Sequence, residues 1–215
     1  RDRLRSRGLG DVYKRQNVMC GLQAPTSGKV YFKGKDVTKR TAEDRRHMGR
    51  VISVVFQNPA TALNPRMVVR EQLLDPMRVH NLGTEAEQEK RVKELLELTG
   101  LPSSAAEVLP GQLSGGQRQR LAIARALAKK PEVVVFDDSF SALDYKTDAR
   151  LREELAKNVT DAALVVVAQR IATIMHADQI IVLDDGHVVG TGTHEELLRS
   201  CAAYLEIAQS QLSAE

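Results

Sequence analysis

Two continuous apolar runs constrain the fold more than any other feature of the chain. VVVF (133–136) and ALVVVA (163–168) lack the alternation of a strand with one solvated face, so they are typical of parallel strands covered on both faces. DYKTDARLREELAKN (144–158) lies between them and predicts the crossover helix that parallel strands require. VISVVF (51–56) predicts another buried strand. The pattern indicates an α/β protein.

Helices and a hairpin are predicted around these strands. Residues 83–100 and 114–130 carry apolar side chains at helical spacing, and QIIVLDDGHVVGTG (179–192) predicts two strands around an Asp-Gly turn. Thr193 begins a capping box. Residues from about 58 to 113 have helical patterns and no strand. We therefore predict a doubly wound, mostly parallel sheet with an inserted α-helical subdomain at about 58–113.

The net charge of +3 argues against nucleic-acid binding once its location is considered. Residues 1–16 hold six Lys or Arg against two Asp, so the rest of the chain carries a net charge of −1. This segment has no helical or strand periodicity, and we interpret it as non-native sequence joined to the protein. A disordered basic arm is the alternative.

No apolar run approaches the roughly 18 residues that a membrane-spanning helix needs, so we expect no direct membrane span. Cys20 and Cys201 lack metal-ligand spacing and suggest no disulfide framework.

The stretch LSGGQ (113–117) places two glycines where a helix should begin. Ser114 can cap this helix, whereas Gly115 and Gly116 each cost about 1 kcal/mol relative to alanine. Close approach of another group to the bare backbone would justify that cost, and a helix N-terminus is suited to phosphate. The alternative is a Gly-rich turn before an ordinary helix.

LSGGQRQRLAIARAL (113–127) resembles the signature motif of ATP-binding-cassette (ABC) ATPases, and the resemblance covers residues 17–212. It implies a P-loop NTPase-like α/β fold, with the ABC ATPase domain in residues 17–215. In that family the signature of one cassette closes over the γ-phosphate of ATP held by a second cassette. The residues that would serve a partner's nucleotide are Ser114, Gly115, Gly116 and Gln117.

EVVVFDD (132–138) resembles the Walker B strand of the same family. The resemblance implies that Asp137 holds Mg²⁺ and that Asp138 stands where the hydrolysing members carry the Glu that polarises the attacking water. SALD (141–144) resembles the D-loop, with Asp144 near the dimer seam. Two carboxylates that merely cap a strand end are the alternative.

Two glutamines complete the expected site. Gln57 matches the Q-loop residue that touches Mg²⁺ and water, and Gln169 stands where the family usually has a switch His. Asp138 is one methylene shorter than Glu, and an amide cannot relay a proton as imidazole can. This pair of differences resembles the degenerate nucleotide site of heterodimeric ABC exporters, which mostly holds ATP.

The family's phosphate cradle, the Walker A pattern G-x-x-x-x-G-K-[ST], has no match. In GLQAPTSGKV (21–30) six residues separate the glycines, and Val30 follows Lys29 where a hydroxyl is required. We do not expect Lys29 to bind phosphate. PTSGKVYFKG (25–34) is interpreted as a turn and strands, and NVMCGL (17–22) as the end of the preceding helix. The cradle is expected just upstream, where residues 1–16 stand.

The two halves of the chain resemble different relatives. Residues 54–80 are similar to cassettes of dipeptide and oligopeptide importers, whereas residues 136–155 and 167–198 resemble exporters with fused membrane domains. We predict a join in or just after the signature helix; a single unusual family is the alternative.

The resemblance as a whole implies a subunit that binds and hydrolyses ATP with Mg²⁺ to power transport. Its expected partners are a second cassette and the transmembrane domains of a transporter, at the cytoplasmic face of the cell membrane, in bacteria the inner membrane. The alternatives are a degenerate, regulatory half of a heterodimeric exporter, an inactive fragment without Walker A, and a soluble ABC protein of translation or DNA repair.

Overall fold

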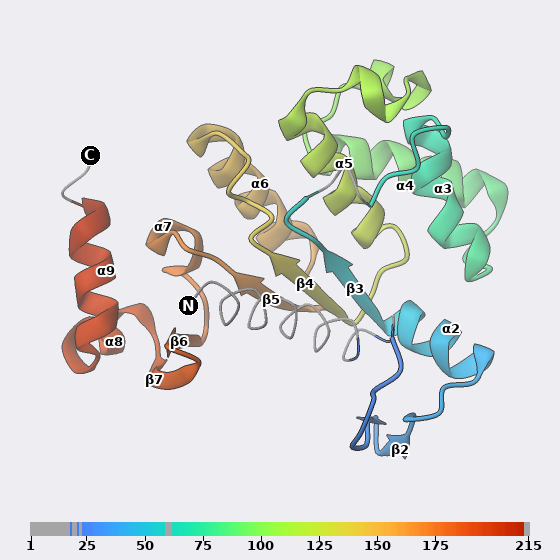
Figure 1. The fold of residues 1–215 in the computed structure, drawn as a ribbon. Helices are drawn as coiled ribbons and strands as arrows, with labels where there is room; N and C mark the ends of the chain where they lie inside the picture. Colours follow the sequence, from blue (N-terminus) through green and yellow to red (C-terminus); the bar gives the residue numbers. More distant parts are fainter. Residues whose placement is uncertain (1–17, 19–20, 22, 59–61, 213–215) are drawn as a thin grey trace, which may run out of the picture.

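A parallel sheet of three strands forms the centre of the molecule (Figure 1). The computed structural model describes residues 18–212 except 19–20, 22 and 59–61, so the predictions for residues 1–16 and for most of 17–22 lie outside the described residues. The strands are β3 (Ile52–Val55), β4 (Val133–Asp137) and β5 (Ala163–Val167), in the order β3-β4-β5. All three coincide with predicted strands, and both pairings are parallel as predicted.

β4 is the middle strand, and its two faces differ in burial. Val134 and Phe136 lie on one face and are fully buried, whereas Val133, Val135 and Asp137 on the other face are half-buried. The equal cover of both faces that the continuous apolar run predicts is therefore not seen among the described residues. α6 (Tyr145–Asn158) crosses from β4 to β5 and buries Leu151 and Leu155. The crossover is therefore formed by the helix that the sequence predicts.

The residues from 62 to 127 contribute helices that lie together at the β3 side of the sheet (Figure 1). They are α3 (Val69–Val79), α4 (Glu85–Leu98), the 3₁₀ turns η2 (Ser103–Glu107) and η3 (Pro110–Gln112), and α5 (Gly115–Leu127). The part of 58–113 that the structure describes contains no strand, as the pattern predicts. The boundaries of a separate helical subdomain stay a prediction.

A short antiparallel pair and a helix precede β3. β1 (Tyr31–Phe32) lies within the predicted turn and strands at 25–34 and pairs with β2 (Lys35–Asp36), which lies just after that range. α2 (Ala42–Val51) leads directly into β3. Thr41 and Asp44 form a reciprocal capping box that fixes the start of α2.

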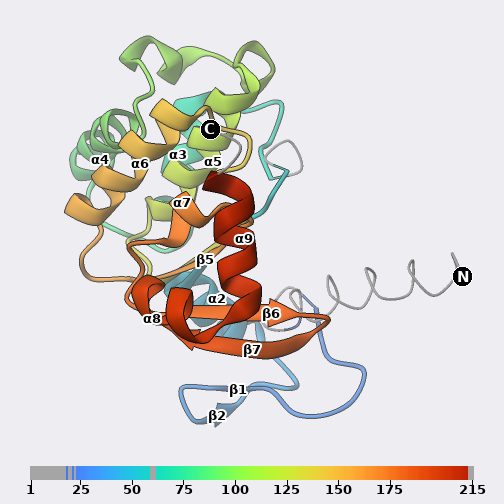
Figure 2. The same ribbon diagram turned by 90° about the vertical axis from the view of Figure 1, so that its left-hand side faces the viewer.

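The C-terminal residues form a second region, which we call the hairpin region. It consists of β6 (Ile180–Asp184), β7 (His187–Gly192), α8 (His194–Ser200) and α9 (Ala202–Leu212), and α7 (Ile171–Ile174) connects it to β5. Figure 2 shows α8 and α9 lying on the β6–β7 hairpin. Asp185 and Gly186 have φ angles of 45° and 79°, as a type I′ turn requires. The hairpin is thus formed as predicted.

The hairpin region has a hydrophobic cluster of its own, formed by Ile180, Val182, Leu197, Cys201 and Tyr204. Its strands do not pair with β5; among the described residues, β6 and β7 form a separate two-stranded sheet. The predicted α/β fold with a mostly parallel central sheet is confirmed, and within the part of the chain that the structure describes this sheet contains β3, β4 and β5.

Candidate functional site

The carboxyl ends of β4 and β5 meet at the two adjacent aspartates. Asp137 is the last residue of β4, and Asp138 has a left-handed backbone with φ 47°, which Asp adopts more readily than most residues. The backbone N–H of Asp138 donates to the carbonyl of Val167 at 3.0 Å. Both carboxylates thus lie at the edge of a parallel sheet where ligands bind in α/β proteins.

The structure brings Gln57 to Asp138, although 81 positions separate them in the sequence. Gln57 follows β3, and its side-chain amide Nε2 donates to Asp138 Oδ2 at 2.9 Å. Because β3 and β4 are adjacent parallel strands, their carboxyl ends lie side by side and place these side chains within reach. Two residues that the sequence assigns to one site are therefore in direct contact.

Ser139 supports the same turn and was missed by the sequence analysis. Its side chain is fully buried, and its hydroxyl donates to the carbonyl of Val55 at 2.8 Å. Ser141 adds a second bond, from its hydroxyl to the Asp138 carbonyl at 2.8 Å. The end of β4 is thereby joined to the end of β3, and no local sequence pattern indicates this contact.

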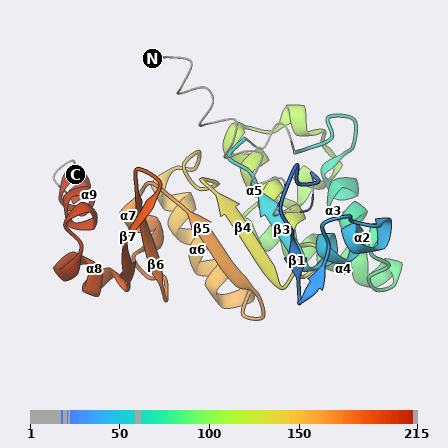
Figure 3. The same ribbon diagram turned by 60° about the horizontal axis from the view of Figure 1, so that its bottom comes forward.

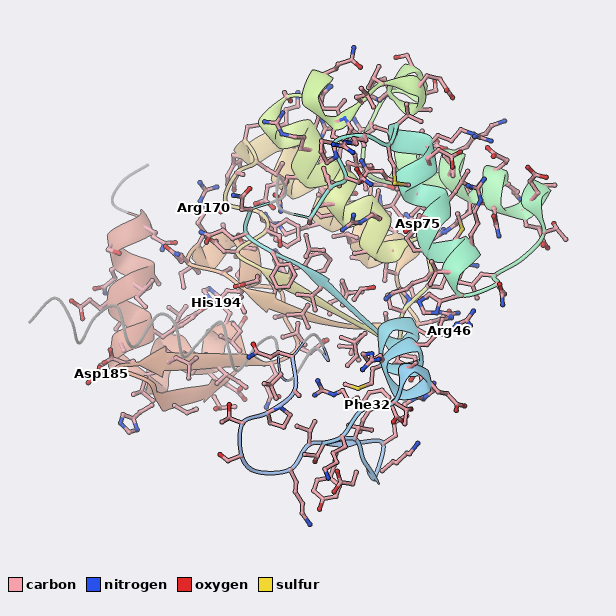
Figure 4. All side chains as sticks on the ribbon, turned by 45° about the vertical axis from the view of Figure 1, so that its right-hand side comes forward. Phe32, Arg46, Asp75, Arg170, Asp185 and His194 are labelled. Atoms are coloured by element: carbon pink, nitrogen blue, oxygen red, sulfur yellow. The ribbon has the colours of Figure 1, made fainter. Side chains whose placement is uncertain are left out.

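A cavity of about 910 Å³ opens beside this turn. Three of the predicted site residues border it, namely Asp138, Asp144 and Gln169. Arg170 and His194, labelled in Figure 4, border it from the loop after β5 and from the start of α8. The cavity therefore lies between the parallel sheet and the hairpin region.

The LSGGQ residues begin α5 as predicted, but none of Ser114, Gly115, Gly116 and Gln117 borders that cavity. Ser114 Oγ accepts from the N–H of Gln117 at 3.2 Å, and Gln117 Oε1 accepts from the N–H of Ser114 at 2.8 Å. A Cβ added at Gly115 would meet nothing within 4 Å, and one at Gly116 would meet only Leu143, at an ordinary 3.6 Å. The described part of the chain therefore does not itself require either glycine.

Asp144 caps the N-terminus of α6. Its Oδ1 accepts from the N–H of Thr147 at 2.9 Å. The backbone N–H of Thr147, followed by its side chain, lowers the pKa of Asp144 below the ordinary value. The carboxylate is therefore held ionised at the helix start, where a negative charge is favourable.

The carboxylates suit a magnesium ion that is bound together with phosphate. The described residues contain no cluster of three or more His, Cys, Asp or Glu side chains able to hold a metal by themselves. Mg²⁺ in nucleotide sites needs only one or two carboxylates, with phosphates and water completing its shell. Asp137, Asp138 and the nearby amide of Gln57 fit this requirement. Lys29 is exposed before β1 and does not border the cavity.

Comparison with known proteins identifies a family and similar chains. Residues 16–141 match the ABC transporter family. The oligopeptide transport ATP-binding protein OppF of Lactococcus lactis subsp. lactis (strain IL1403) is 33% identical over 183 residues, which cover 84% of this chain and 57% of that protein. The uncharacterized ABC transporter ATP-binding protein Rv1273c of Mycobacterium tuberculosis (strain ATCC 25618 / H37Rv) is 57% identical over 98 residues, 46% of this chain and 17% of that protein.

A solved structure shares the fold. The ATP-binding cassette MJ0796, in a dimeric post-hydrolysis state bound to ADP and Pi, has a TM-score of 0.74 and 31% identity, over 85% of this chain and 80% of its own. The chain thus spans most of MJ0796 but less than two thirds of OppF or Rv1273c. From the family match over residues 16–141 and the shared fold, we conclude that the chain belongs to the ABC transporter family.

Proposed function

We propose that the chain is an ATP-binding cassette that hydrolyses ATP, together with a second cassette, to power transport across a membrane. The observation that carries this proposal is the cluster of Asp137, Asp138 and Gln57 at the carboxyl ends of β3 and β4. Family membership and the likeness to MJ0796, whose structure holds ADP and Pi, support the same assignment.

Within this site each side chain has a distinct task. Bound ATP would supply the phosphoanhydride bond, and bound Mg²⁺ the positive charge that offsets charge developing on the phosphates. Asp137 would hold the ion. Asp138 would orient the attacking water, with Gln57 fixing its carboxylate, and the Gln169 amide would donate to the γ-phosphate.

The signature residues would act on the nucleotide of a second cassette. The open backbone at Gly115 supports this role, because a Cβ added there would meet no described atom within 4 Å. Gly115 and Gly116 would present their N–H groups and the positive end of the α5 dipole to phosphate, because the N–H groups of Ser114 and Gln117 are used in the capping box. Asp144 would lie near the seam between the cassettes.

We assign the membrane-spanning part of such a transporter to partner domains, with the cassette at the cytoplasmic face. No helix among the described residues is both long and apolar enough to cross a bilayer. OppF, which this chain resembles over 84% of its length, is an oligopeptide transport protein.

A degenerate, ATP-holding site is the second candidate, and the Gln57–Asp138 contact favours it. The carboxylate of Asp138 accepts from Gln57 at 2.9 Å, so one of its oxygens is engaged by protein rather than by water. Such a site would bind ATP and turn it over slowly.

Calorimetric titration of the 215-residue chain with Mg-ATP tests binding first. We expect saturable binding that Asp137→Asn weakens at least about tenfold and that Asp161→Asn, at an exposed carboxylate before the amino end of β5, leaves nearly unchanged. No binding up to millimolar nucleotide would contradict the proposal that this chain holds ATP.

The rate of phosphate release from ATP then distinguishes a hydrolysing site from a degenerate one. If the site is degenerate, Asp138→Glu combined with Gln169→His raises turnover by at least about an order of magnitude, because a carboxylate misplaced by about 1 Å can cost ~100-fold in rate. Turnover that stays unchanged in the double variant rejects the degenerate site.

A further inference from the structure

Four basic side chains gather at the amino ends of β3 and β4. Arg46 and Arg50 belong to α2, which leads into β3. His80 follows the last residue of α3, and Lys129 lies between α5 and β4. Figure 3 shows α2 next to α3, and Arg46, labelled in Figure 4, lies where these two helices meet. Residues far apart in the sequence are thus brought to one end of the sheet.

Arg50 and Lys129 each bind the backbone beside the other. Arg50 Nη1 donates to the carbonyl of Lys129 and, at 3.0 Å, to that of Lys130. Lys129 Nζ donates to the carbonyl of Gly49 and, at 2.9 Å, to that of Ile52. Two positive charges are therefore held close together by carbonyl oxygens rather than by a carboxylate.

His80 lies within the electric field of these charges. Arg46 Nη2 donates to the carbonyl of Val79 at 2.6 Å, which brings this guanidinium next to His80. Burial, and after it the charges of Lys129 and of the two arginines on α2, lower the pKa of His80 below its ordinary value. His80 is therefore neutral near pH 7, and its ring keeps one N–H donor.

Among the described residues, no carboxylate forms an ion pair with Arg46, Arg50 or Lys129. The hydrogen bond from Lys33 is the main cause that lowers the pKa of Glu132, and the charge of Arg50 adds to it. Glu132 is thus near Arg50, but it is already paired with Lys33 at 2.8 Å. The positive charge at this end of the sheet is not neutralised by such a pair.

Carbonyl groups at or just after the ends of α2, α3 and α5 account for part of this positive charge. Each helix C-terminus is equivalent to about half a negative charge, so three of them offset about 1.5 charges. Arg46, Arg50 and Lys129 carry one positive charge each. About 1.5 positive charges therefore remain, which a dianion would neutralise.

Donor groups also remain for such an anion. The hydrogen bonds of Arg50 come from Nη1 alone, which leaves Nε and Nη2, and Lys129 binds two carbonyls with three N–H donors. Arg50, His80 and Lys129 are half-buried and Arg46 is exposed, so a small ligand can reach them. A planar guanidinium beside an ammonium matches the oxygens of a phosphate group.

We propose that these four side chains form a binding site for a phosphate dianion, either the free ion or the terminal phosphate of a small monoester. We call it the basic site; its residues are Arg46, Arg50, His80 and Lys129. The five residues of β4 separate it from the proposed nucleotide site by about 17 Å, at roughly 3.3 Å per residue, so one phosphate cannot contact both. The inference does not depend on ATP hydrolysis.

Proton NMR of the histidine rings in the 215-residue chain tests the basic site without ATP. Inorganic phosphate is added at pH 7.5 and constant ionic strength, with chloride as the balancing ion, and His80→Gln identifies the His80 signal. We expect a saturable shift of that signal. The pKa of His80 should also rise when phosphate is bound, because the anion offsets the charges that lower it.

Two variants and a matched control test the geometry. Arg50→Gln should weaken phosphate binding at least about tenfold, because it removes a charge and the planar donors. Arg45→Gln removes an equal charge from an exposed position on α2, where Arg45 bonds the Arg40 carbonyl at 3.2 Å, and should change binding less than about twofold. If Arg50→Gln does not fold, Arg46→Gln at an exposed residue provides the same test, with an expected weakening of about fivefold.

Glycerol phosphate, a monoester, is titrated in the same way, and binding of either ligand supports the proposal. Inorganic phosphate alone would identify the free ion as the ligand, and binding of the monoester would identify a terminal phosphate group.

A His80 signal that shows no saturable shift with either ligand would overturn the proposal. Binding that Arg50→Gln and Arg46→Gln leave intact would also overturn it, because the phosphate would then be bound elsewhere. Equal weakening by Arg45→Gln would reduce the effect to general surface charge and would reject a specific site.

Discussion

The strands β3, β4 and β5 and the helices packed on them form what we call the parallel-sheet region. This region and the hairpin region are built from similar apolar strands but differ in burial. β4 is paired on both edges and buries Val134 and Phe136 completely, within a large cluster that also includes α3, α4, α5 and α6. The hairpin region buries five residues in a separate cluster and leaves Ile181, Leu183 and Val188 exposed. Apolar sequence alone thus does not decide burial; the number of paired edges and covered faces does.

The largest effect is expected in the parallel-sheet region. Phe136→Ala should lower the free energy of unfolding by about 3–5 kcal/mol, because it leaves a cavity beside Phe140, whose ring centroid lies 5.1 Å away. Urea unfolding followed by circular dichroism measures the change. Tyr31→Ala, at a 60% exposed aromatic residue, serves as the control and should stay within about 0.5 kcal/mol.

A smaller and local effect is expected in the hairpin region. Leu197 is fully buried among five residues, and Leu197→Ala should cost about 2 kcal/mol, because a small cluster can partly collapse around the missing atoms. Hydrogen exchange should accelerate in β6, β7 and α8 while the amides of α5 keep their rates. Equal acceleration in α5 would show that the two regions unfold as one unit.

The contact between the two regions should contribute less to stability than either hydrophobic cluster. Gln211→Ala removes two hydrogen bonds, to Ile171 and Gln169, and should favour opening of the hairpin region by about 1–2 kcal/mol. Gln211→Glu keeps the acceptor for the Ile171 N–H and should show about half of that change. Amide hydrogen exchange in β6, β7 and α8 measures this opening. If these amides exchange at the same rate in both variants as in the original protein, Gln211 does not hold the regions together.

The smallest expected effect is a change with pH in the free energy of unfolding of the parallel-sheet region. Burial, and after it the charges of Arg50 and Arg125, lower the pKa of Lys129 from 10.5 to about 8. The folded protein therefore binds fewer protons than the unfolded chain between these values, so the free energy of unfolding should rise with pH above 8. With screening at this half-buried site, we expect about 1 kcal/mol.

Lys129→Met isolates this contribution, since other groups also titrate in the same range. Urea unfolding of both proteins at pH 7.5, 8.5 and 9.5 should show a shallower rise in the variant, and exchange in the hairpin region should not respond. Parallel slopes in the two proteins would mean that Lys129 keeps an ordinary pKa.

Local elements could be predicted from the sequence because their causes are local. The N-caps at Ser114 and Thr193, the Asp185–Gly186 turn and the crossover helix after Asp144 all lie where the pattern indicates. The family resemblance assigned Gln57 and Asp138 to one site, but it did not predict the hydrogen bond between them. Three interpretations stay predictions: the roles of the site residues, the origin of residues 1–16 and the different relatives of the two halves.

Other features could not be predicted, because each depends on groups far apart in the chain. The buried hydroxyl of Ser139 bonds Val55, 84 positions away, and Gln211 bonds residues 40 and 42 positions away. No periodicity or motif in the sequence indicates either contact.

Sequence by itself determined where the three parallel strands, the crossover helix, the helix after LSGGQ and the C-terminal hairpin lie, and which carboxylates and amides follow the strands. It did not predict α2 or α9. Periodicity, capping and turn chemistry act over a few residues, so they can be recognised in the sequence. Only the tertiary structure decided that, within the described ranges, β5 pairs with β4 alone and β6 with β7 alone, and that Asp138 accepts a hydrogen bond from Gln57. Edge pairing and side-chain contacts depend on which distant segments meet in space, and a linear pattern does not carry that information.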